Sequence, residues 1–165
     1  MACLDWIFSK TKVFSLYLQG KTPFCFWRYG MMNSVQKPKI TLFHCLNSFR
    51  ETPGLFAGCD PTIVKMACSS MTRDIFILKA FEAGADAVLV LVCPENACRY
   101  AQGSIRAKKR VAYVKTILDD IGLNGERLSI FTTTANGSDP VSPIIQNTLK
   151  KLETLGPNPA VNPCN

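Results

Sequence analysis

The sequence predicts an α/β protein built as a three-layer, doubly wound and mainly parallel sheet of about four strands. Short apolar runs alternate along the chain with longer stretches that place their apolar residues on one helical face. The run Ala87–Val92 (AVLVLV) is apolar at every position, which is typical of a central parallel strand buried on both faces. The helical stretches span roughly 10–18 residues, long enough to cross back between parallel strands.

Four apolar runs are assigned as strands. They are Ile40–Phe43, Thr62–Met66, Ala87–Val92 and Leu128–Thr132. The segment Asn47–Cys59, between the first two strands, stays ambiguous because Pro53 and Gly54 interrupt any regular pattern.

Three helices are predicted between and after the later strands. They are Arg73–Ala83, a long helix from about Ser104 to Ile121, and Pro143–Leu155. Ser70 or Thr72 is suitably placed to cap the first of them. Each helix is followed by a glycine, the residue that most readily ends a helix; these are Gly84, Gly122 and Gly156.

The segment Met1–Gly30 differs from the rest of the chain, because it is rich in aromatic residues and has neither a strand nor a helix period. Met31 and Met32 follow it, and a short polar lead then precedes the first strand. We interpret Met31 or Met32 as the start of translation, with a targeting or docking extension as the alternative. We therefore expect a single α/β domain over residues 31–160, a separate N-terminal extension over 1–30, and a loose tail over 161–165.

The composition favours a protein of the cytoplasm. No apolar stretch approaches the roughly 18 uninterrupted residues of a membrane-spanning helix. Eight cysteines in 165 residues are fewer than a disulfide scaffold carries, and no convincing signal peptide is present. In a reducing compartment such cysteines serve as metal ligands or redox groups rather than disulfides. The net charge of +7 favours an anionic partner.

Four cysteines lie near the predicted carboxyl ends of strands. Cys45, Cys68 and Cys93 each follow a predicted strand, and Cys98 comes five residues after Cys93. The carboxyl ends of parallel strands share one edge of the sheet, which is where open sheets bind ligands. Four convergent thiolates suit Zn²⁺ or an iron–sulfur cluster better than an organic substrate. We therefore predict a single site formed by these four residues.

The spacing of these cysteines, C-x22-C-x24-C-x4-C, favours iron–sulfur over zinc. Structural zinc sites usually use paired C-x2–4-C knuckles, whereas a [2Fe–2S] cluster accepts one C-x4-C segment with remote partners. The alternative for each cysteine alone is that it packs as a small hydrophobic residue. Cys59 precedes the second strand, at the opposite end from Cys68, and is left outside the site. No role is assigned to Cys3, Cys25 or Cys164, and His44 is interpreted as a strand-end residue.

A group of basic residues follows Cys98. They are Arg99, Arg106, Lys108, Lys109, Arg110 and Lys115. The ordinary interpretation is a solvated helix face, and the functional one is a docking face for an acidic protein beside a redox centre. Nucleic acid is not expected, because no helix-turn-helix or RNP motif accompanies these charges. No phosphate-binding loop, nucleophile elbow or zinc-protease motif occurs, so the sequence argues against an independent enzyme with catalytic residues of its own.

From Lys39 to Ala160 the chain resembles the delta subunit of methyl-viologen-reducing hydrogenase. Five segments carry the resemblance: KMACSS (65–70), FILKAFEAGADAVLVLVC (76–93), CRY (98–100), GSIRAKKRV (103–111) and LGPNP (155–159). The resemblance implies a small [2Fe–2S] protein that passes electrons between hydrogenase or dehydrogenase modules and heterodisulfide-reductase flavoproteins. It also implies that Cys45, Cys68, Cys93 and Cys98 fall on family cysteines.

Two departures from the family pattern bear on this expectation. Ser48 stands where the family usually has the second cysteine of a C-x-x-C, and the segment before the second strand looks shorter than usual. A diverged member could therefore serve another reductase, such as one of a one-carbon system. The expected function is an electron-transfer subunit, and the alternative is a zinc-stabilised docking module without redox activity. A nucleotide-binding α/β domain is a third hypothesis, which the absence of a glycine-rich phosphate loop disfavours.

Overall fold

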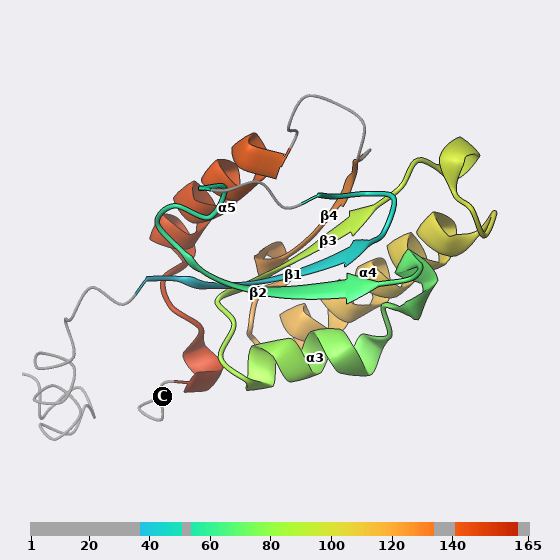
Figure 1. Cartoon of the computed structure of the whole chain (residues 1–165). Coiled ribbons are helices and arrows are strands. Elements are labelled where there is room, and N and C mark those ends of the chain that lie inside the picture. Colours follow the sequence, from blue (N-terminus) through green and yellow to red (C-terminus); the bar gives the residue numbers. More distant parts are fainter. Residues whose placement is uncertain (1–36, 51–53, 134–140, 162–165) are drawn as a thin grey trace, which may run out of the picture. The chain divides into compact units, whose positions relative to one another are not determined.

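The computed structural model describes residues 37–50, 54–133 and 141–161. Within them, four strands form one all-parallel sheet with the order β2-β1-β3-β4 (Figure 1). The strands are β1 (Lys39–Cys45), β2 (Asp60–Met66), β3 (Ala87–Val92) and β4 (Leu128–Thr132). The predicted fold class is therefore confirmed, and β3 and β4 begin and end at the residues that the apolar runs indicated.

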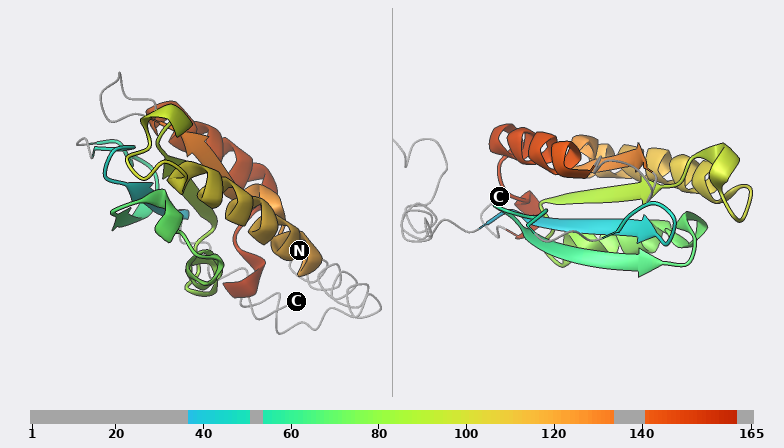
Figure 2. Two further views of the ribbon diagram at one scale, coloured as in Figure 1. Left: turned by 90° about the vertical axis from the view of Figure 1, so that its right-hand side faces the viewer. Right: turned by 45° about the horizontal axis from the view of Figure 1, so that its top comes forward.

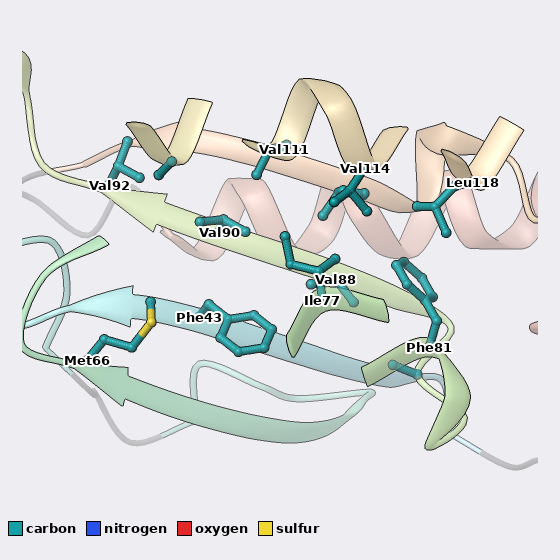
Figure 3. Packing of buried hydrophobic residues seen from close by; sticks show 13 residues of the cluster. Phe43, Met66, Ile77, Phe81, Val88, Val90, Val92, Val111, Val114 and Leu118 are labelled. Atoms are coloured by element: carbon teal, nitrogen blue, oxygen red, sulfur yellow. The ribbon is translucent and has the colours of Figure 1, made fainter. Parts of the chain in front are cut away.

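Helices cover both faces of this sheet (Figure 2), so the fold has three layers. On one face, α3 (Asp74–Glu82) and α4 (Gly103–Asp120) pack against alternate residues of the strands, such as Val88 and Val90 (Figure 3). On the other face, α5 (Val141–Leu155) packs against the intervening residues, such as Leu89. All six residues of β3 are buried because each faces one of these two apolar layers.

The connection from β1 to β2 differs from the predicted alternation of strand and helix. In this connection residues 46–48 and 54–58 form turns, and none of its described residues is helical. Gly54 and Gly58 both have positive φ angles, a conformation that ends regular helix, and Phe49 and Leu55 are buried beside α5. The loop thus fills the place in its layer that a crossover helix would otherwise occupy.

Two other local predictions are wrong. Neither Ser70 nor Thr72 caps α3: Arg73 stands at the cap position without a side-chain hydrogen bond, and Ser70 lies in the short 3-10 helix η1 (Ser69–Met71). In addition, β1 continues to Cys45, so this cysteine is the last residue of the strand rather than a residue beyond it. Its pairing with Met66 of β2 provides the physical reason for the extension.

The amino edge of the sheet is closed by two buried polar side chains. The Arg127 guanidinium donates hydrogen bonds to the backbone carbonyls of Leu123, Asp86, Leu155, Gly156 and Pro157. The Asn158 amide donates to the carbonyls of Phe81 and Ala85. The conspicuous LGPNP segment therefore serves this structural clamp, at the end of the sheet opposite the cysteines of interest.

The N-terminal segment and the tail enter no part of this description. Residues 1–36 and 162–165 lie outside the described ranges, and so does the predicted boundary at residue 30. In the part of the chain that the structure describes, no helix is long and apolar enough to cross a membrane.

Candidate metal centre

Two of the four predicted site residues lie at the carboxyl ends of neighbouring strands. Cys45 ends β1, and Cys93 directly follows β3. The two strands pair in parallel and end at the same edge of the sheet (Figure 1). With His44 opposite Leu91, Cys45 and Cys93 therefore both lie at this edge. The chain crosses from one side of β1 to the other between β2 and β3, which makes this edge the switch point where such sheets bind ligands.

Cys93 is the link between three of the thiols. Its side chain lies close enough to those of Cys45 and Cys98 to interact with both. Burial, followed by the neighbouring charge of Cys45 and by these interactions, raises the pKa of Cys93 to about 12. In the protein without metal, Cys93 is therefore a protonated thiol at neutral pH.

The fourth sulfur, that of Cys68, joins the group through a glycine. A Cβ atom added to Gly103 would overlap Cys68 Sγ and would lie 3.1 Å from Cys98 Sγ. The two sulfurs therefore converge on the first residue of α4, in space that any other residue would fill with its side chain. Cys68 Sγ also accepts a 3.5 Å hydrogen bond from the backbone N–H of Ser70, which holds the sulfur in place.

Cys98 differs from Cys93 because it lies against unpaired N–H groups at the start of α4. Burial acts to raise the pKa of its thiol. Four hydrogen bonds oppose this effect; they come from the backbone of Tyr100, the backbone of Ser104, the side chain of Cys93 and the backbone of Gly103. Together they lower the pKa of Cys98 below the ordinary thiol value, because the first N–H groups of a helix stabilise an anion. The site thus favours a thiolate at this position.

The donor set consists of thiols alone, arranged as two neighbouring pairs. Cys45 lies beside Cys93, while Cys68 and Cys98 lie against Gly103. Among the described residues, no group of three or more His, Cys, Asp or Glu side chains is arranged to hold one metal ion. Paired thiolates without carboxylate or histidine suit a soft metal or a two-iron cluster, in which each iron takes two cysteines.

Two buried hydroxyl groups near this site have no protein partner. Ser69 Oγ and Ser104 Oγ are fully buried and make no hydrogen bond within the described residues. Ser69 Oγ lies 3.5 Å from the position of a Gly103 Cβ, on the side where the two sulfurs converge. An unpartnered buried hydroxyl is costly unless something else occupies its hydrogen-bonding direction. The surroundings of the four thiols therefore fit a bound group with acceptor atoms, such as the sulfurs of a cluster.

Ser48 is engaged with the backbone beside Cys45. Its hydroxyl accepts from the Cys45 N–H at 3.1 Å and lies within donor distance of the carbonyls of Cys45 and Leu91. Its own carbonyl accepts a 2.6 Å hydrogen bond from the Thr133 hydroxyl. At this position the serine ties the end of β1 to β3, and its oxygen is fully used within the protein.

Cys59 and His44 make local contacts outside the group of four thiols. Cys59 is buried just before β2, packs in the core cluster beside α5 and donates to the Phe56 carbonyl at 3.5 Å. Cys3, Cys25 and Cys164 lie outside the described residues. His44 is buried, with Nδ1 3.1 Å from the Cys45 carbonyl oxygen and its ring edge-on to Phe49.

A groove of about 540 Å³ opens to the surface beside Cys68 and Gly103. Its walls include the largely exposed side chains of Met71 and Tyr100 and the exposed Arg106. The groove opens the sulfur site to the surface from the side of η1 and the start of α4.

The basic residues after Cys98 do not form one uniform face. Arg110 donates to the carbonyls of Ser70 and Thr72 and so ties η1 to α4. Lys108 pairs with Glu95 at 2.8 Å. Arg106 lines the groove, and Arg99 is exposed nearby in the chain. The positive charge that a partner would meet at the groove is thus contributed chiefly by Arg106.

Three residues at the site were not identified from the sequence. Gly103, Ser69 and Ser104 come together near the sulfurs only in the folded chain, and no local pattern marks such an arrangement. Two of the segments that carry the family resemblance, KMACSS and GSIRAKKRV, contain all three residues. The family resemblance therefore included these residues, but the spacing of residues in the sequence did not reveal their role.

Comparisons with known proteins give two kinds of relative, beginning with a family of small hydrogenase subunits. The family described as "Methyl-viologen-reducing hydrogenase, delta subunit" matches residues 58–156. The vhu iron-sulfur subunit of an F420-non-reducing hydrogenase from Methanocaldococcus jannaschii is 34% identical over 97 residues, which cover 59% of this chain and 72% of the relative. The corresponding protein from Methanococcus maripaludis is 32% identical over 96 residues, 58% of this chain and 72% of the relative.

A second kind of relative contains the matched region within a much longer chain. One subunit of the ferredoxin/F420H2-dependent CoB-CoM heterodisulfide reductase of Methanosarcina acetivorans is 35% identical over 95 residues. Those residues cover 58% of this chain but only 12% of the relative. The matched region therefore occurs both in small proteins and as part of a larger polypeptide.

Proposed function

Because the chain belongs to the family of the methyl-viologen-reducing hydrogenase delta subunit, we propose that it is an iron–sulfur electron-transfer subunit. It relays electrons between a hydrogenase or dehydrogenase module and a heterodisulfide-reductase-type or one-carbon reductase partner. The observation that carries the proposal is the convergence of two thiol pairs at the carboxyl edge of the sheet. The names of the relatives, which are an iron-sulfur subunit in one case and part of a heterodisulfide reductase in the other, point to the same role.

The proposed ligands of a [2Fe–2S] cluster are Cys45, Cys68, Cys93 and Cys98. A bound cluster would supply a site that takes up and releases one electron at a time. The protein contributes burial of the thiols and N–H groups directed at sulfur, from Ser70 to Cys68 and from the start of α4 to Cys98. These groups stabilise negative charge on the ligand sulfurs and so favour the reduced form.

The partner of this protein is expected to meet it at the groove beside Cys68. Exposed apolar surface at Met71 and Tyr100, next to the charge of Arg106, combines contact area with electrostatic attraction to an acidic surface. A heterodisulfide-reductase-type flavoprotein is the favoured partner, because related sequence occurs inside a heterodisulfide reductase chain.

Anaerobic purification followed by iron, sulfide and zinc analysis tests the proposal. We expect about two irons and two sulfides per chain, with visible absorbance and an electron paramagnetic resonance signal after reduction. Cys68→Ala leaves one iron with an open position and is expected to lose most of the cluster. Cys59→Ala, the matched control at the other end of β2, is expected to retain it.

Three results would contradict this proposal: a colourless wild-type protein, full iron content in Cys68→Ala, or equal loss in both variants. The colourless result with one tightly bound zinc would instead support the zinc-stabilised docking module, since zinc–thiolate sites have no visible bands.

A further inference from the structure

The hydroxyl group of Ser69 is a buried hydrogen-bond donor in η1. Ser69 is fully buried in η1, directly after Cys68, and its carbonyl accepts the Thr72 N–H at 3.0 Å. Its side-chain oxygen has no hydrogen-bond partner among the described residues. The backbone of the residue is thus held firmly, while the hydroxyl is left for something outside the protein chain.

The position of this hydroxyl relates it to the two sulfurs. The point that a Gly103 Cβ would occupy lies 3.5 Å from Ser69 Oγ and 3.1 Å from Cys98 Sγ, and it overlaps Cys68 Sγ. Because residue 103 is glycine, it places no side chain at this point between the three atoms. The hydroxyl of Ser104, on the next residue of α4, is also buried and has no hydrogen-bond partner among the described residues.

The buried hydroxyl of Thr148 provides a comparison. Thr148, in α5, is also buried, but its hydroxyl donates to the Ile144 carbonyl at 2.8 Å, as helical threonines commonly do. Ser69 has no comparable backbone acceptor. Local hydrogen bonding therefore explains the hydroxyl of Thr148 and leaves that of Ser69 unexplained.

We propose that Ser69 donates its O–H to a sulfur of the bound iron–sulfur cluster and thereby raises the reduction potential of the cluster. The proposal rests on the proposed function. It adds a residue that adjusts the reduction potential of the cluster without being one of its ligands. Reduction adds negative charge to the cluster, so a hydrogen bond to its sulfur stabilises the reduced form more than the oxidised form. Removing the donor must then lower the potential.

The test compares Ser69→Ala with wild type and with Thr148→Val, which removes a buried hydroxyl far from the site. Redox titration monitored by electron paramagnetic resonance is expected to show about a tenfold shift of Ser69→Ala toward the oxidised form at a fixed ambient potential. For a one-electron couple this shift corresponds to about 59 mV. Iron content is expected to stay at the wild-type level, and Thr148→Val is expected to keep the wild-type potential.

Urea denaturation of the metal-free proteins provides a second measurement. If Ser69 had a purely structural role, Ser69→Ala would lower the denaturation midpoint. Because the Ser69 hydroxyl has no partner among the described residues, Ser69→Ala is expected to leave the denaturation midpoint unchanged or to raise it. Thr148→Val breaks a hydrogen bond and is expected to lower the midpoint.

The outcomes separate the two proposals. Full iron with an unchanged potential in Ser69→Ala overturns the role of Ser69 and leaves the electron-transfer function standing. A clear loss of metal-free stability in Ser69→Ala also overturns it, because the hydroxyl would then have a partner within the protein. Wild-type protein that binds no iron overturns both proposals.

Discussion

At the scale of single residues, Gly103 shows how an absent side chain shapes the site. It begins α4, where Ala or Ser would favour helix formation more than glycine does. Its distinguishing property is that Cys68 Sγ and Cys98 Sγ occupy the space of a Cβ. A backbone this close to two sulfurs also brings the first N–H groups of the helix within hydrogen-bonding reach of Cys98.

Gly103→Ala is therefore expected to displace the Cys68 sulfur and to reduce iron content by at least about half, although Ala favours helix by about 1 kcal/mol. Anaerobic iron and sulfide analysis measures the loss. Gln102→Ala, at the adjacent exposed position, is the control and is expected to retain full iron. Equal iron in wild type and Gly103→Ala would show that the Cys68 sulfur has room to move without cost.

The residue scale also shows what sequence reasoning could and could not provide. Cys45, Cys68 and Cys93 could be assigned to one edge because each follows an apolar run, and parallel strands end together. Ser69 could not be identified, since its significance depends on Gly103 and Cys98, which come close only in the folded chain. Ligation by the four cysteines stays a prediction that metal analysis must test.

At the scale of elements, the strands were predicted better than the segments that join them. The six apolar residues of β3 specify a buried strand without reference to anything else, whereas η1 and η2 (Glu95–Ala97) are too short to show a period. The β1–β2 loop was ambiguous for a related reason. Its Phe49 and Leu55 are buried by packing against another layer rather than by any regular local pattern.

The helix α5 is fastened to the sheet by Arg127, which joins the end of α5 to the start of β3 through backbone carbonyls. Arg127→Lys is expected to lower the free energy of unfolding by about 3 kcal/mol, because a single ammonium cannot replace the planar set of donors and leaves carbonyls unsatisfied. Urea denaturation of the metal-free protein measures the change.

Arg73→Lys is the matched control, since Arg73 is exposed and makes no capping bond through its side chain. It is expected to change stability by less than about 0.5 kcal/mol. If the two variants are equally stable, the hydrogen bonds of Arg127 contribute nothing beyond what any cation would provide.

At the scale of the whole molecule, the amino and carboxyl edges of the sheet have different roles. The amino edge is closed by Arg127 and Asn158. The carboxyl edge gathers thiols, N–H donors and the open groove beside Cys68. Stability and the proposed redox role are thus separated by the length of the strands, so that changes at one edge can be tested without unfolding the other.

Charge reversal tests the proposed docking surface at this scale. Arg106→Glu is expected to slow electron transfer to a purified heterodisulfide-reductase-type flavoprotein by about tenfold at low ionic strength, with the difference shrinking as salt is added. Lys150→Glu makes the same charge change on exposed α5 and is expected to have little effect. Equal slowing by both variants would indicate a response to net charge rather than docking at the groove.

The contact between Cys45 and Cys93 has a consequence for how the protein matures. β1 and β3 are neighbours in the sheet, yet β2 and α3 lie between them in the chain. With the proposed ligands, a nascent chain offers no four-thiol site until β3 has paired with β1 and the start of α4 has packed beneath Cys68. With these ligands, iron delivery would therefore follow folding. Partial opening of the β1–β3 pair would release the metal before the rest of the core unfolds.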